Sequence, residues 1–249
     1  MILYYALGGG LGHLTRARKV VDALGLDDVV LLTASRFARD PRVTGGLPVL
    51  PIPRRLGHDR EAFRAWLQPV LREADELIVD SFPAGILGEL SGMALPPARH
   101  VARRLRWNAY EPRLDGPLPD YDVIYELEPI AHDLGPLEPL ELAREPPGEA
   151  LAGEPHWLVV HSGPPHETDE LIRRAAGAPR LIVVSPLHQD IYPVAPHLGH
   201  AERIITGGGF NAVHEAMPWR ERHTIVPFPR ALDDQFARAQ CGRGSASRW

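Results

Sequence analysis

A glycine-rich segment near the start of the 249-residue chain ends in a histidine. The segment reads GGGLGH over residues 8–13, and it lies between an apolar stretch and an amphipathic one. Glycines between a strand and a helix leave backbone N–H groups free at the helix N-terminus, where an anion or another polar ligand binds favourably. The segment is not the dinucleotide-binding fingerprint, which has a glycine at the position of His13. A histidine here can act as a general base near neutral pH, or it can serve only for packing or capping.

A second glycine-rich segment, TGGGFN over residues 206–211, follows another apolar stretch. Three successive glycines allow backbone amides to approach a phosphate closely. Glu215 follows about one helical turn later, where its carboxylate can bridge the two vicinal hydroxyls of a ribose. Taken alone, Glu215 can also be explained by a favourable interaction with the helix dipole. The combination of the glycines and the carboxylate favours a nucleotide site.

Acidic and amide side chains follow the segment PFP of residues 227–229, at Asp233, Asp234 and Gln235. At the start of a helix such side chains accept hydrogen bonds from the first N–H groups. They can also hydrogen-bond the hydroxyls of a sugar. Taken alone, this pattern favours the helix cap.

Short apolar strands alternate with amphipathic stretches, a pattern typical of parallel sheets covered by helices on both faces. Strands are expected over residues 2–7, 29–33, 49–52, 77–79, 123–127, 157–160, 181–184, 203–206 and 224–226. Helices are expected over residues 14–24 and 61–74, from about 85, near 168–176 and from about 211. The strand over 123–127 is expected to be the last of the first run.

The stretch from residue 129 to 155 is rich in Pro, Gly and Glu and has weak periodicity, which indicates a linker. We therefore expect an α/β protein of two Rossmann-like domains, residues 1–150 and 151–249, with parallel sheets facing a central cleft. Each domain supplies one of the two glycine-rich segments.

The charge and cysteine content exclude several classes of protein. The net charge of −5 argues against a nucleic-acid-binding protein, which normally shows a basic footprint. The single cysteine permits neither an intrachain disulfide nor a cysteine-based zinc site. No signal peptide is recognisable, and no apolar run approaches the ~18 residues of a membrane span. A cytoplasmic location is expected, with at most peripheral contact with the inner face of the membrane.

A group of histidines and a group of arginines are explained without assigning a binding site to them. His156, His161 and His166 fit no zinc-ligand spacing, so no metal site is expected. A basic cluster consists of Arg99, Arg103, Arg104 and Arg106. These side chains can bind an anionic lipid or a pyrophosphate, but the favoured explanation is a surface exposed to solvent.

These motifs resemble those of GT-B-fold glycosyltransferases, in the branch that contains the peptidoglycan lipid-intermediate N-acetylglucosaminyltransferase and related predicted glycosyltransferases of family 28. Residues 8–13 are similar to a G-G-x-G-G-H loop, and residues 204–215 to a strand followed by G-A-x-T-x-x-E. Residues 227–239 resemble P-F/L-x(4–5)-D-x-Q-x-x-N-A. Residues 161–163 stand where the family has a G-G-S turn, and residues 80–89 resemble a D-x-F-P-x-G stretch. The resemblance extends over nearly the whole chain.

The resemblance implies transfer of a sugar from a nucleotide diphosphate donor, UDP-linked, to an acceptor hydroxyl on a small or lipid-linked molecule. It implies an inverting, metal-independent reaction with no cofactor besides the nucleotide-sugar co-substrate. The residues implied to bind the donor are Ser162, Gly163, Gly208, Gly209, Phe210, Asn211, Glu215, Asp234 and Gln235. On the acceptor side they are Gly9, Gly10, Gly12, Pro83 and Gly85, with His13 as the catalytic base. For a histidine of ordinary pKa, near 6.5, activity would fall as the pH drops through that value.

The sequence also departs from the family pattern. His161 replaces a glycine, and Pro164 and Pro165 remove two N–H donors from the following turn. Two alternatives therefore stay open beside the transferase. One is a non-catalytic nucleotide-sugar-binding or accessory subunit, and the other is a nucleotide-sugar epimerase on the same fold.

Overall fold

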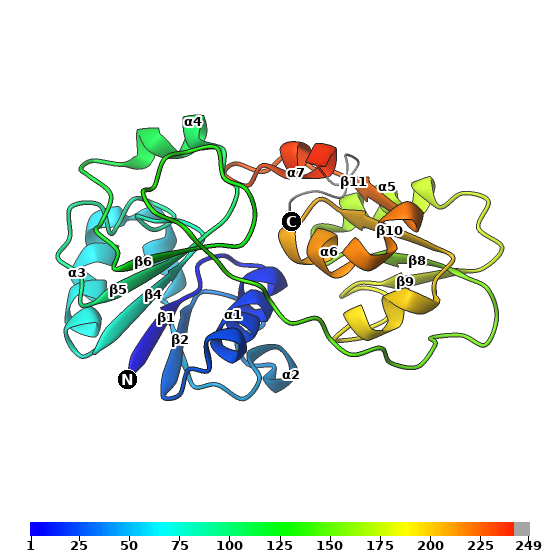
Figure 1. Ribbon diagram of the computed structural model, residues 1–249, viewed down its shortest axis with the longest axis horizontal. Helices are drawn as coiled ribbons and strands as arrows, with labels where there is room; N and C mark the ends of the chain where they lie inside the picture. Colours follow the sequence, from blue (N-terminus) through cyan, green and yellow to red (C-terminus); the bar gives the residue numbers. More distant parts are fainter. Residues whose placement is uncertain (242–249) are drawn as a thin grey trace. The chain divides into compact units, whose positions relative to one another are not determined.

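The computed structural model describes residues 1–241 (Figure 1). The chain forms two compact units. Among the described residues, the first contains Met1–Ala143 and Ala231–Asp233, and the second contains Arg144–Arg230 and residues 234–241. The segment Ala231–Asp233 joins the first unit through its backbone, since the Arg106 N–H donates to the Leu232 carbonyl at 2.8 Å.

The first unit is built on a parallel sheet in the order β3-β2-β1-β4-β5-β6-β7. Its strands are β1 (Ile2–Tyr5), β2 (Val29–Thr33), β3 (Val49–Pro51), β4 (Glu76–Asp80), β5 (Ala98–Ala102), β6 (Val123–Glu126) and β7 (Glu138–Pro139). Figure 1 shows β1, in dark blue, between β2 and β4. The chain builds outward from β1 to β2 and β3, and then restarts on the other side of β1 with β4. The sheet therefore has a topological switch point between β1 and β4.

The second unit has a parallel sheet in the order β11-β10-β8-β9. Its strands are β8 (Trp157–Val160), β9 (Leu181–Val184), β10 (Arg203–Gly207) and β11 (His223–Val226). The chain moves from β8 to β9 on one side and then returns to β10 on the other. This sheet has its own switch point, between β8 and β10.

The helices lie mainly in the connections between strands. In the first unit they are α1 (Leu11–Leu24), α2 (Pro41–Thr44), η1 (Arg54–His58), α3 (Arg60–Arg72), α4 (Trp107–Tyr110) and η2 (Glu111–Arg113). In the second they are α5 (Pro165–Arg174), η3 (Ala195–His200), α6 (Phe210–Glu215), η4 (Met217–Arg222) and α7 (Gln235–Cys241). Among residues 1–241, no helix is long and apolar enough to cross a membrane.

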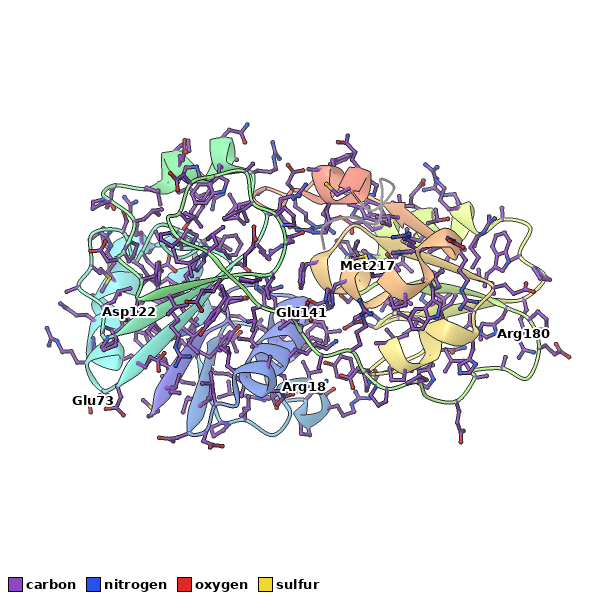
Figure 2. All side chains as sticks on the ribbon, in the orientation of Figure 1. Arg18, Glu73, Asp122, Glu141, Arg180 and Met217 are labelled. Atoms are coloured by element: carbon purple, nitrogen blue, oxygen red, sulfur yellow. The ribbon has the colours of Figure 1, made fainter. Side chains whose placement is uncertain are left out.

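Side-chain contacts explain how individual helices are fixed. Asp59 accepts a hydrogen bond from the Ala62 N–H at 3.0 Å and caps α3. The buried face of α3 packs on the sheet at the i, i+4, i+8 spacing through Phe63, Leu67 and Leu71. Arg18 of α1, labelled in Figure 2, donates to the Arg42 carbonyl at 3.0 Å and so ties α2 to α1.

The expected strands and the expected alternation with helices are confirmed, and the main corrections concern the segment after β4. The helix expected from about residue 85 is wrong, because Ser81, Gly85, Gly88 and Gly92 all have positive φ, between 67° and 80°. Every residue of a right-handed helix has a negative φ, so a helix cannot run through positions with positive φ at such short intervals. This stretch forms turns instead, and β5, which the sequence did not predict, follows it. The strand β6 is also not the last of its sheet, since β7 pairs with it.

Candidate functional site

His13 lies at the switch point of the first sheet. α1 begins at Leu11, three residues earlier than expected, so His13 stands in the first turn of the helix that follows β1. Asp80 is the last residue of β4, the neighbour of β1. Open α/β sheets bind ligands outside the carboxyl ends of their strands at such a point. There His13 Nδ1 lies 3.0 Å from Asp80 Oδ2.

Asp80 is held as a buried carboxylate by a neighbouring arginine. Arg16, one turn after His13 on α1, donates from Nε to Asp80 Oδ1 at 2.7 Å, and its Nη2 also contacts Oδ2. Burial alone would raise the pKa of Asp80. The charge of Arg16 and the hydrogen bonds from His13 and Arg16 outweigh burial and keep that pKa below its ordinary value. Asp80 is therefore ionised at neutral pH.

His13 is neutral at the same pH. Burial lowers the pKa of His13 to about 4; the charge of Arg16 acts in the same direction, while the hydrogen bond to Asp80 opposes it. This corrects the expectation of an ordinary value near 6.5. The side chain still has 16% of its surface exposed, so a substrate can reach it.

The edge of the ring that carries Nε2 lies over Gly8. A Cβ at residue 8 would collide with His13 Cδ2 and Nε2, and Gly8 has φ +140°, which residues with side chains rarely adopt. Glycine at this position therefore leaves the space beside Nε2 open. The imidazole also stacks on Phe82, with ring centroids 6.0 Å apart.

A chain of buried polar contacts continues from Arg16. Arg16 Nη2 donates to Ser81 Oγ at 2.7 Å, and Arg103 Nε donates to the same oxygen at 2.8 Å. Arg103 Nη1 then donates to Asp233 Oδ1 at 2.5 Å. Arg103 is only 6% exposed, so the solvated face expected for its cluster is wrong at this position. The segment 231–233 is thereby held in the first unit.

The residues expected on the acceptor side divide into two groups. Gly9 and Gly10 are exposed, Gly10 being the N-cap of α1, and Gly12 lies inside the helix. Pro83 and Gly85 are buried in the turns after β4, and their carbonyls accept hydrogen bonds from two tyrosine hydroxyls, those of Tyr121 and Tyr110. The glycines of the first loop face solvent, whereas Pro83 and Gly85 support the turn that carries Phe82.

The switch point of the second sheet brings together residues that follow β8 and β10. His161 comes directly after β8, and a Cβ on Gly207, the last residue of β10, would lie 3.2 Å from the His161 ring. The next glycine, Gly208, is buried against α7. Its carbonyl accepts a hydrogen bond from the fully buried Arg238 at 2.8 Å, and a Cβ there would lie 3.0 Å from Gln235 Cβ. The structure thus unites the second glycine turn with α7.

Gln235 and Asp234 both make contacts that hold α7 in place. Gln235 Oε1 accepts from the Phe228 N–H at 3.0 Å, and Gln235 is buried. Asp234 Oδ1 accepts from the Ala237 N–H at 3.0 Å, in the first turn of α7. The cap favoured by the sequence pattern is therefore present at Asp234.

Ser162 and Gly163 lie beside an ion network that the sequence did not reveal. Glu167 accepts from both terminal nitrogens of the Arg230 guanidinium, at 2.5 and 2.6 Å, and its Oε2 lies 2.8 Å from His161 Nε2. Burial lowers the pKa of His161. Ser162 is exposed, and a side chain on Gly163 would collide with His161. Among the described residues, no group of three or more potential ligand side chains is arranged to hold a metal ion.

The second glycine segment leads into the short helix α6. Gly209 is its N-cap, Phe210 is buried, and Asn211 is partly exposed. Glu215 is the last residue of α6. A carboxylate is unfavourable at a helix C-terminus, so the helix dipole does not explain Glu215.

Comparisons with known proteins identify the fold. No protein-family model matches the sequence, and no curated protein matches it. Several solved structures match at low identity. Spinosyn rhamnosyltransferase SpnG complexed with thymidine diphosphate has a TM-score of 0.58 and 15% identity, covering 96% of this chain and 83% of that chain. The glycosyltransferase SnogD from Streptomyces nogalater has a TM-score of 0.54 and 15% identity, covering 92% and 82%. The chain therefore has the GT-B fold of glycosyltransferases, as the sequence motifs implied.

Proposed function

We propose that the protein is a glycosyltransferase that moves a sugar from a nucleotide diphosphate donor, UDP-linked, to the hydroxyl of an acceptor. The observation that carries this proposal is a neutral histidine held by a buried, ionised aspartate at the switch point of the first sheet. The GT-B fold supports it. One solved neighbour is a rhamnosyltransferase with thymidine diphosphate, and another structure of that enzyme contains a spinosyn aglycone.

His13 would act as the general base. Because the Asp80 carboxylate can only accept, His13 Nδ1–H would donate to it, which would leave the lone pair of Nε2 for the proton of the acceptor hydroxyl. The hydroxyl oxygen attacks the anomeric carbon, the bond from that carbon to the diphosphate breaks, and the hydroxyl proton passes to Nε2. A base whose pKa is about 4 takes this proton only as the oxygen forms its new bond. The imidazolium that results is stabilised by the Asp80 carboxylate 3.0 Å away.

The second unit would hold the donor. Backbone N–H groups of the turn at Gly208 and Gly209 would face the diphosphate, and Glu215 would bind the ribose hydroxyls. Gln235 is the first residue of α7 and Asp234 precedes it, and α7 packs on the same turn. The reaction would be a single displacement with inversion that uses no metal ion. We place the protein in the cytoplasm, with at most peripheral contact with a membrane.

The environment of Asp80 argues against the epimerase alternative. An epimerase needs a second acid or base near His13, and Asp80 is the carboxylate within hydrogen-bond distance of its ring. Asp80 is buried against Arg16 and has a lowered pKa, so it cannot supply a proton. Asp80 is therefore suited to orient the base and not to exchange protons itself.

A panel of radiolabelled nucleotide sugars with hydroxyl acceptors tests the proposal. A transferase releases nucleoside diphosphate and labels the acceptor, an epimerase converts the donor without an acceptor, and an accessory subunit only binds. Wild type should label an acceptor, while His13→Ala should bind the donor and release almost none of its nucleotide.

A further inference from the structure

A cavity of about 610 Å³ opens where β2 and β3 of the first unit end. Thr33 and Ser35 line it from the end of β2, and Ile52 lines it just after β3. The volume lies within the range of small-molecule sites, roughly 300–1,000 Å³. The cavity is at the carboxyl edge of the sheet, the edge where parallel α/β sheets bind ligands.

Three arginines without a carboxylate partner surround this cavity. Arg36, Arg39 and Arg54 line it and are exposed, and its lining contains no acidic residue. Within residues 1–241, the side chains of Arg39 and Arg54 make no hydrogen bond or ion pair, and the Arg36 guanidinium lies over the Phe37 ring, 4.8 Å from its centroid. Three like charges around one cavity create a positive potential that an anionic group neutralises.

Three buried or half-buried arginines of the same unit are paired with carboxylates. Arg16 pairs with Asp80, Arg103 with Asp233, and Arg99 with Glu76. The acidic residue nearest in sequence to the cavity arginines, Asp40, is already engaged by Arg42 at 2.7 Å. Three guanidinium groups without a carboxylate partner among residues 1–241 therefore line one cavity, in a chain whose net charge is negative.

Hydrogen bonds connect the wall of the cavity to the loop that precedes His13. Ser35 Oγ donates to the carbonyl of Gly10, the N-cap of α1, at 3.2 Å. The Ser35 N–H donates to Thr33 Oγ1 at 3.2 Å, which fixes the turn after β2. Because β1 and β2 are adjacent parallel strands, a molecule anchored in the cavity lies at the same sheet edge as His13.

We propose that this cavity binds a phosphate or carboxylate group of the acceptor, so that the sugar acceptor is an anionic hydroxyl compound. Arg36, Arg39 and Arg54 would bind the anionic group by charge-assisted hydrogen bonds. Val49 and Ile52 give the cavity an apolar wall for the body of the molecule. This inference rests on the proposed function, because it assigns the cavity to the acceptor of that reaction.

Isothermal titration calorimetry with phenyl phosphate, benzoate, inorganic phosphate and benzyl alcohol tests the inference without any donor. Wild type should bind phenyl phosphate or benzoate more tightly than inorganic phosphate, because the apolar wall contributes, and should not bind benzyl alcohol. The double variant Arg39→Gln/Arg54→Gln should lose at least about tenfold in affinity, as expected for charge-assisted hydrogen bonds. The matched control is Arg55→Gln/Arg72→Gln, which removes the same charge from exposed positions outside the lining. It should stay within about twofold of wild type.

A second variant, Ala38→Glu, places a carboxylate in the lining and should also weaken binding of the anions. Equal affinity of wild type and Arg39→Gln/Arg54→Gln, or an equal loss in the control, would overturn the inference. UDP titrations of the same variants keep the two proposals apart, since donor affinity should not change in any of them. Anion binding that depends on the cavity, in a protein that neither binds nor turns over any nucleotide sugar, would overturn the proposed function and the acceptor assignment while leaving the anion site in place.

Discussion

The rate of sugar transfer should stay nearly constant as the pH falls from 7 to 5. Burial and the charge of Arg16 lower the pKa of His13 to about 4, so about 0.9 of the molecules keep His13 neutral at pH 5. At an ordinary pKa near 6.5 the neutral fraction would drop from about 0.76 at pH 7 to about 0.03 at pH 5, and the rate would fall about 25-fold. The acidic limb of the profile is therefore expected near pH 4.

The pKa of His13 can be measured directly by NMR titration of the imidazole carbon-bound protons. The His13→Ala variant identifies the resonance by its loss and should lower turnover by ~10²–10⁴ with donor affinity nearly intact. Circular dichroism must show that this variant is folded. A titration midpoint near 6.5, or a rate that drops about 25-fold between pH 7 and pH 5, would refute the link between burial and the state of the base.

Three further predictions concern the donor site and stability. Glu215→Ala should weaken nucleotide diphosphate binding by roughly 1.5–3 kcal/mol, the scale of hydrogen bonds to a charged group; unchanged affinity in calorimetry would remove Glu215 from the site. Gly85→Ala should lower the free energy of unfolding by more than about 2 kcal/mol, because φ is +80° and the new Cβ collides with the Glu89 carboxyl group. Gly46→Ala, at φ +79° with open space, should cost less in the same urea titration. Burial lowers the pKa of His100 to about 4, so the unfolded state takes up its proton first, and the free energy of unfolding should fall by about 2.5 kcal/mol from pH 7.5 to pH 4.5 through this residue. His100→Asn should reduce that fall, and an unchanged pH dependence would contradict the assignment.

The sequence predicts the central strands well because parallel strands buried on both faces are continuous apolar runs. The ranges 29–33, 157–160 and 181–184 agree with β2, β8 and β9 at both ends. By contrast, β5 was missed because Arg99 and His100 interrupt its apolar pattern. Such interruptions are compatible with a strand when each polar side chain has a partner: Arg99 pairs with Glu76, and His100 Nδ1 lies 2.8 Å from the Val79 carbonyl.

The sequence located the two glycine segments at the carboxyl ends of strands, where the structure has them after β1 and β10, but it did not reveal the partners of the candidate site residues. Asp80 lies 67 residues from His13, and only the strand order, which places β4 beside β1, brings them together. The position of Asp80 at the end of an apolar strand was the available indication. Glu167 and Arg230 are 63 residues apart, and no local pattern marks their ion pair.

The most direct test of the central claim is release of nucleoside diphosphate from a panel of nucleotide sugars, with and without hydroxyl acceptors. Wild type should release the nucleotide only when an acceptor is present, and the labelled sugar should appear on that acceptor. His13→Ala should bind the same donor with nearly the same affinity and release it at least about 100-fold more slowly. A wild-type protein that binds the donor but transfers no sugar to any acceptor, and so behaves like His13→Ala, would contradict the claim and indicate a nucleotide-sugar-binding protein without catalytic activity.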